Sequence, residues 1–121
     1  EGGTVLVLGL TFKENCPDLR NTKAVDLING LKVRGFKVDV HDAAADPVEA
    51  KQFFNIDLKP SLNDLPDHSY AAVVGVVSHD SYKDIKACEF ERLLEPGGLI
   101  ADIKAMWSNV EKPKYIRKWQ L

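Results

Sequence analysis

Cysteine, histidine and long apolar runs are all scarce in this chain of 121 residues, and each scarcity argues against a class of protein. The two cysteines and three histidines are scattered without the spacing of metal ligands, so we expect neither a zinc site nor a disulfide framework. We therefore expect reduced cysteines and a cytoplasmic protein. No apolar stretch approaches the roughly 20 residues that a membrane-spanning helix needs.

An excess of charge of one sign is also missing. Sixteen basic and eighteen acidic residues give a net charge of -2, without a long block of like charge. Nonspecific binding of nucleic acid depends on a basic surface, so we expect none. With 45% hydrophobic residues, residues 1–121 can bury one ordinary core, and we expect a single domain. The chain opens with Glu1 rather than Met, which leads us to expect a fragment of a longer protein without a secretory signal.

The apolar pattern alternates between strands and helices. Residues 4–9 form a short, almost wholly apolar run, as in a strand that is covered on both faces. Residues 24–31 show apolar positions at helical spacing, with Asn21 or Thr22 as the N-cap. A short helix is expected to open at Pro47 and to turn its two phenylalanines, Phe53 and Phe54, toward the core.

Further strands are predicted at residues 36–42, 71–77 and 99–102, with a short edge strand at 56–58. Further helical segments are predicted at residues 62–65 and 88–94, the latter ending at the breaker Pro96-Gly97-Gly98, while residues 107–121 stay unassigned. This alternation predicts a Rossmann-like, three-layer α/β/α fold with a mostly parallel sheet of about five strands.

A glycine-rich phosphate loop is the next absence. Ligands of open α/β sheets bind outside the carboxyl ends of the strands, which here are residues 9–20, 41–44, 78–82 and 102–105. A dinucleotide-binding turn after the first strand would read Gly-x-Gly-x-x-Gly, whereas this chain reads Gly-Leu-Thr-Phe-Lys-Glu from Gly9 onward. We therefore expect that this domain does not bind NAD by itself.

Two cations stand in the place of the missing glycines. Lys13 and Arg20 follow the first strand and precede the N-terminus of a predicted helix, an arrangement that suits a phosphate group. Two such side chains on one loop are also common as solvated surface residues, and Asp18 could simply pair with Arg20.

The segment from Val7 to Thr22 reads Val-Leu-Gly-Leu-Thr-Phe-Lys-Glu-Asn-Cys-Pro-Asp-Leu-Arg-Asn-Thr. It resembles the signature that opens the C-terminal, UDP-binding domain of UDP-glucose and GDP-mannose dehydrogenases. The Glu-Asn-Cys-Pro wording looks closest to the branch that oxidises UDP-N-acetylhexosamines for surface polysaccharides, including the Vi-antigen type. Residues 38–42 and 95–104 extend the resemblance over nearly the whole chain.

The resemblance implies roles for four residues. Phe12 and Lys13 would contact the nucleotide sugar, Lys13 near its phosphates, and Lys104 would contact the substrate from a later turn. Arg20 would reach the NAD that a separate amino-terminal domain holds. The family often has Tyr-Asp-Pro after the second strand, where this chain has His41-Asp42-Ala43, so we expect that turn to be structural.

The family reaction turns the C6 hydroxyl of the sugar into a carboxylate by two hydride transfers to NAD. No position here resembles the family's catalytic cysteine. We expect Cys16 not to be a nucleophile and Cys88 to lie in the core. His79 is expected to be a loop or cap residue, or to line the site with Asp80. The implied partners are a UDP-sugar (UDP-N-acetylhexosamine or UDP-glucose), the enzyme's own NAD-binding domain and further copies of the full-length chain.

Two hypotheses from other classes are open. A non-catalytic, Rossmann-like interaction or oligomerisation module would agree with the absence of a nucleophile and of an acid–base pair. A receiver domain of flavodoxin type would need an acidic cluster after the first strand, but that strand ends in Gly-Leu-Thr from Gly9. The receiver hypothesis therefore fits poorly.

Overall fold

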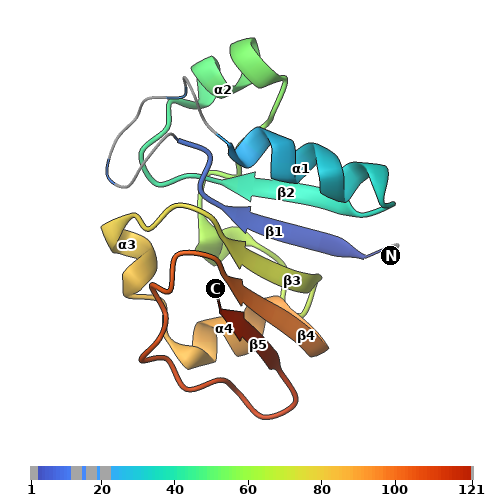
Figure 1. Cartoon of the computed structure of the whole chain (residues 1–121), viewed down its shortest axis with the longest axis vertical. Coiled ribbons are helices and arrows are strands. Elements are labelled where there is room, and N and C mark those ends of the chain that lie inside the picture. Colours follow the sequence, from blue (N-terminus) through green and yellow to red (C-terminus); the bar gives the residue numbers. More distant parts are fainter. Residues whose placement is uncertain (1–2, 12–14, 16–18, 20–22, 121) are drawn as a thin grey trace.

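A computed structural model of the chain describes residues 3–11, 15, 19 and 23–120. Within them, five parallel strands form one sheet in the order β2-β1-β3-β4-β5. Figure 1 shows their arrowheads pointing the same way. The strands are β1 (Thr4–Leu8), β2 (Lys37–His41), β3 (Tyr70–Gly75), β4 (Leu94–Asp102) and β5 (Arg117–Gln120).

Helices lie between the first four strands in the chain and cover both faces of the sheet. Figure 1 shows α1 and α2 beside β1 and β2, and α3 and α4 beside the strands of the other half. The helices are α1 (Ala24–Val33), α2 (Pro47–Phe54), α3 (Asp80–Lys83) and α4 (Ala87–Leu93), with a 3-10 turn η1 (Leu62–Asp64). None of the helices in the described part of the chain is long and apolar enough to cross a membrane.

The sheet separates two hydrophobic cores because successive side chains of a strand point to opposite faces. On β1, Val5 and Val7 belong to the core beneath α1 and α2, whereas Leu6 and Leu8 belong to the core beneath α4. Trp107 is the largest fully buried side chain, and its ring packs edge-on against Phe90 at 4.8 Å between centroids. The predicted α/β/α class with a five-stranded parallel sheet is confirmed.

The fifth strand is not the one that the sequence pattern indicated. Residues 56–58 contribute only an isolated bridge between Leu58 and Val40. The strand that completes the sheet is β5, which lies in the unassigned segment and pairs with residues 99–102. Strand β4 also begins directly after α4, so Pro96, Gly97 and Gly98 lie inside an irregular strand rather than before it.

Two predictions about individual side chains are wrong, and a third falls on residues that the structure does not describe. Phe53 is 57% exposed, because Ala50 is the fully buried position of α2 and Phe54 lies one turn from it on the same side. Cys88 is exposed, because α4 turns Phe90 and Leu93 toward the core. The residue preceding α1 is Lys23, without a side-chain capping bond, and the N-caps expected from the sequence lie outside the described residues.

Candidate functional site

The strand order places a switch point between β1 and β3. From β1 the chain first crosses to β2 on one side and then returns to form β3 on the other. The loops that leave the carboxyl ends of β1 and β3 therefore diverge, which in doubly wound sheets opens the crevice where ligands bind. The candidate site is this edge of the sheet, with residues 9–11 following β1, Asp42 following β2, residues 76–79 following β3 and residues 103–105 following β4.

Gly9 is required at this edge by packing rather than by a ligand. Its φ of +114° is a backbone conformation that residues with a side chain rarely adopt. A Cβ atom at this position would lie 2.6 Å from Val77 Cβ. Its backbone N–H donates to the His41 carbonyl at 2.8 Å. The side of Gly9 that lacks a Cβ is thus filled by Val77, so this glycine does not supply a phosphate cradle.

Asp42 holds the start of the first loop. Its Oδ2 accepts from the backbone N–H groups of Leu10 (2.6 Å) and Thr11 (2.9 Å), while its Oδ1 accepts from those of Ala44 and Ala45 (both 2.8 Å). Burial by itself would raise the pKa of this carboxyl. Hydrogen bonds from His79 and from these backbone groups nevertheless hold the pKa of Asp42 well below its ordinary value.

His79 completes this network from the end of β3. The side chain is 1% exposed, and its Nε2 lies 3.0 Å from Thr11 Oγ1 and 3.0 Å from Asp42 Oδ1. The backbone N–H of Asn15 donates to His79 Nδ1 at 2.8 Å. Because Nδ1 accepts this bond, it carries no proton, and the neutral ring must carry its proton on Nε2.

Tyr82 of α3 packs between two histidines. Its ring centroid lies 5.6 Å from that of His41 and 5.5 Å from that of His79. The hydroxyl donates to the His41 carbonyl at 3.0 Å and lies 2.7 Å from His41 Nδ1. Burial raises the pKa of Tyr82, with a further contribution from the nearby Asp42 charge, and burial lowers the pKa of His41. Both side chains are thereby kept neutral near pH 7.

A second buried carboxylate, Asp102, shapes the turn after β4. It accepts from the backbone N–H groups of Met106 at 2.9 Å and Trp107 at 2.8 Å. Lys104 lies in this turn and is exposed, and the following residue, Ala105, has a φ of +55°. Trp107 anchors the far end of the turn, since its Nε1 donates to the Tyr82 carbonyl at 2.7 Å.

Of the four residues to which the sequence resemblance assigned a role, Lys104 lies within the described part of the chain. Phe12, Lys13 and Arg20 lie outside the described residues, although Thr11 and Asn15 on either side of Phe12 and Lys13 are described. Lys104 lies at the same edge of the sheet as these loop residues, with β3 between their strands.

The sequence interpretation missed the linkage of the Asp42 carboxylate and the His79 ring to the first loop. Both residues come directly after predicted strands, which was a usable signal, but Asp42 was assigned only to a structural turn. Among the described residues, no three His, Cys, Asp or Glu side chains form a group that could hold a metal ion.

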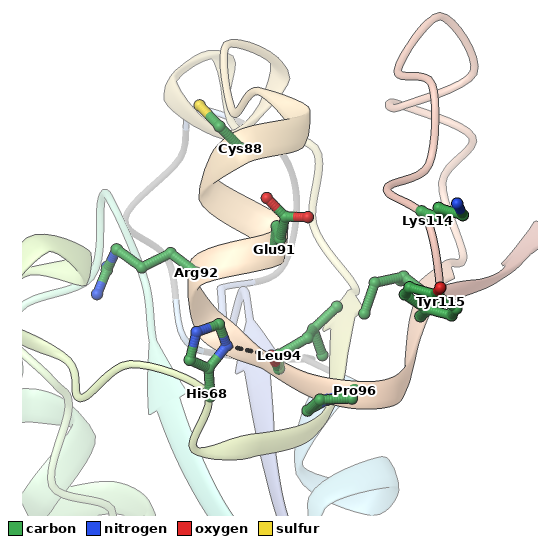
Figure 2. A pocket seen from close by; sticks show the side chains of 9 residues that line it. His68, Cys88, Glu91, Arg92, Leu94, Pro96, Lys114 and Tyr115 are labelled. Atoms are coloured by element: carbon green, nitrogen blue, oxygen red, sulfur yellow. Dashed lines mark hydrogen bonds between the residues drawn. The ribbon is translucent and has the colours of Figure 1, made fainter.

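A groove of about 450 Å³ lies elsewhere on the molecule. Its walls include Cys88 on α4, Pro96 near the start of β4 and Tyr115 before β5, so it lies toward the amino-terminal ends of the strands. Figure 2 shows the Arg92 side chain extending away from Tyr115, and Arg92 Nη2 donates to the Leu62 carbonyl. Since its guanidinium is engaged with the protein, we do not place an anionic ligand in this groove.

The switch-point geometry and the absence of a glycine-rich cradle together define a doubly wound α/β domain of nucleotide-binding type whose first loop differs from the usual NAD-binding turn. A family model described as "UDP-glucose/GDP-mannose dehydrogenase family, UDP binding domain" matches residues 6–109, and the chain belongs to that family.

Individual relatives agree with this membership. The chain is 41% identical over 121 residues to Protein CapL of Staphylococcus aureus, covering 100% of this chain and 28% of the relative. It is 32% identical to a UDP-N-acetyl-D-glucosamine 6-dehydrogenase of Salmonella typhi, covering 86% of this chain and 24% of that protein. The chain thus spans about a quarter of the length of these curated relatives.

A solved structure shares the fold. The UDP-N-acetyl-mannosamine dehydrogenase Cap5O from Staphylococcus aureus superimposes with a TM-score of 0.72 over 99% of this chain and 26% of that protein. At 19% sequence identity this likeness concerns the fold alone.

Proposed function

We propose that this chain is the substrate-side domain of a cytoplasmic, NAD-dependent UDP-sugar 6-dehydrogenase and that it binds the UDP moiety of a UDP-N-acetylhexosamine. The full enzyme would convert this substrate to the uronate by two hydride transfers, for the synthesis of a surface polysaccharide. Residues 1–121 would form one C-terminal domain of a longer, homo-oligomeric chain. The observation that carries the proposal is a first loop anchored at the switch point by Asp42 and His79 in a chain that belongs to the family of UDP-binding domains.

The proposed contacts divide between two loops at one edge of the sheet. Phe12 and Lys13 contact the nucleotide sugar from the loop after β1, and Lys104 contacts it from the turn after β4. An ammonium group beside a diphosphate forms a charge-assisted hydrogen bond, which is stronger than a bond between neutral groups. Asp102 fixes the turn that carries Lys104, and Asp42 fixes the backbone of Thr11, which precedes Phe12 and Lys13 in the chain.

NAD does not fit this domain as its main binding site. Val77 fills the space beside Gly9 that a Cβ atom would occupy, and the remaining positions of the glycine fingerprint are occupied by larger residues. We propose that an amino-terminal domain holds NAD and that Arg20 reaches it from this chain. The isolated chain should accordingly show no turnover of UDP-N-acetylhexosamine with NAD, and measurable turnover would contradict this division of roles.

An amide NMR titration of the chain with UDP, with GDP and NAD as comparators, tests the proposal. We expect UDP to be preferred and shifts to be confined to residues 9–20 and 102–105. Lys13→Ala should weaken binding by about 1–3 kcal/mol through the loss of a charge-assisted contact. Lys114→Ala is the matched control, because Lys114 is an exposed lysine beside the groove toward the amino-terminal ends of the strands.

Two results would count against the proposal. Equal UDP affinity in Lys13→Ala and Lys114→Ala would remove Lys13 from the site. No response of either loop to UDP at millimolar concentration would favour the alternative, a non-catalytic interaction module built on the same fold.

A further inference from the structure

The two ring nitrogens of His79 contact the first loop at two points. Nε2 lies 3.0 Å from Thr11 Oγ1, and Nδ1 accepts from the Asn15 backbone N–H at 2.8 Å. Thr11 and Asn15 flank residues 12–14 in sequence, and these three include Phe12 and Lys13. One imidazole ring therefore holds both ends of the short segment that carries the proposed phosphate-binding lysine.

Asn15 is held by more than this one bond. Its side-chain Oδ1 accepts from the backbone N–H of Asp80, the residue next to His79, at 3.0 Å. Its φ of +56° lies in the left-handed region, which asparagine tolerates better than most residues. A backbone conformation that is costly for the isolated chain persists when its surroundings fix it, and here His79 and Asp80 supply the contacts.

The Nε2 atom of the ring contacts a different group. It faces the buried Asp42 carboxylate, which is bonded to the backbone of Leu10 and Thr11 and to the Thr11 hydroxyl. The Nε2 contacts are therefore part of the buried polar network, whereas the Nδ1 contact is the one that reaches Asn15. The two nitrogens can be tested separately.

We propose that His79 is a positioning residue for UDP binding, acting through its Nδ1 bond to the backbone of Asn15 in the loop after β1. The proposal depends on the proposed function in one respect, that Lys13 contacts the phosphates. His79 itself is buried beneath the loop and contacts no ligand in this scheme.

Two substitutions separate the nitrogens. In His79→Asn the amide oxygen lies as many bonds from Cβ as Nδ1 does, so it can still accept from Asn15 but cannot reach Asp42. In His79→Gln the amide nitrogen lies as many bonds from Cβ as Nε2 does, so it can still donate to Asp42. No acceptor atom of glutamine takes the position of Nδ1, two bonds from Cβ, to accept from Asn15. The purified 121-residue chain is titrated with UDP, and its stability toward urea and the amide exchange of Asn15 are measured for each variant.

The two variants should rank in one order by stability and in the opposite order by UDP affinity. His79→Asn should be the less stable variant, because it leaves the Asp42 side of the network without its donor, yet it should bind UDP within about twofold of wild type once folded. His79→Gln should be the more stable variant but should bind UDP roughly tenfold more weakly, with faster exchange at Asn15. A purely structural role would make affinity follow stability, and that result would overturn the proposal.

The two proposals fail in different ways. If wild type does not bind UDP, the proposed function is wrong, and UDP affinity no longer supports a positioning role. If wild type binds UDP and His79→Gln binds it equally tightly, or if Asn15 exchanges equally in both variants, the role of His79 is refuted while the proposed function stands.

Discussion

Replacing Asp42 with asparagine should be far more damaging than the same change at an exposed aspartate. The Asp42 side chain is fully buried, and its two oxygens accept bonds from four backbone N–H groups. An amide has only one oxygen, so in either orientation its NH2 group faces two backbone donors. Two N–H groups without acceptors, buried at Leu10 and Thr11 or part-buried at Ala44 and Ala45, together with the loss of a buried charge from its network, cost about 3–5 kcal/mol of unfolding free energy.

The matched control is Asp46→Asn. Asp46 is the N-cap of α2, where its Oδ1 accepts from the Val48 N–H at 2.9 Å in an exposed position. Asparagine caps helices about as well as aspartate, so this change should cost less than about 0.5 kcal/mol. Urea denaturation at pH 7, followed by circular dichroism, measures both variants. A difference of less than about 1 kcal/mol between them would refute the reasoning.

The pH dependence of the Asp42 variant follows from the direction of its pKa shift. The folded-state pKa is lowered, so the stabilisation by the Asp42 charge is fully present above the ordinary value of 3.8. It is lost as the pH falls below 3.8 and through the folded-state pKa. The stability difference between wild type and Asp42→Asn should therefore stay constant from pH 7 to about pH 5 and narrow below about pH 4. A constant difference down to pH 2 would show that the charge is not the stabilising form.

Two further predictions concern packing at the same edge. Gly9→Ala should lower the free energy of unfolding in urea by about 2–4 kcal/mol, because Val77 occupies the space that the new Cβ needs. Gly35 also has a positive φ but faces open space, so Gly35→Ala should lower it by only about 1 kcal/mol. Equal losses of unfolding free energy in the two variants would show that backbone strain, and not the contact with Val77, explains the need for glycine at position 9. Trp107→Phe should cost about 2–4 kcal/mol by the same measurement, since it leaves a cavity and removes the Nε1 bond to the Tyr82 carbonyl, which also accepts from the Ile85 N–H at 3.2 Å. A cost below about 1 kcal/mol would contradict that assignment.

Local patterns predicted most of the fold. Buried parallel strands read as short apolar runs, which is why the strand at residues 4–9 and the central strand at residues 71–77 were found. Strand β5 was missed because it is a mostly exposed edge strand, Arg-Lys-Trp-Gln, which pairs with β4. Such a strand has no signature of its own, because its stability comes from a neighbour that is distant in the chain.

The sequence by itself determined the class of the protein and predicted the segments that we propose to face its ligand. The apolar periodicity, the missing glycine fingerprint and the signature from Val7 to Thr22 are all local features, so they can be identified without coordinates. Only the tertiary structure decided how that signature loop is held. Asp42 and His79 lie 37 residues apart, and both meet Thr11 because the crossovers bring the ends of β1, β2 and β3 to one edge. A hydrogen-bond network between such distant residues depends on the order of the strands, which no local pattern records.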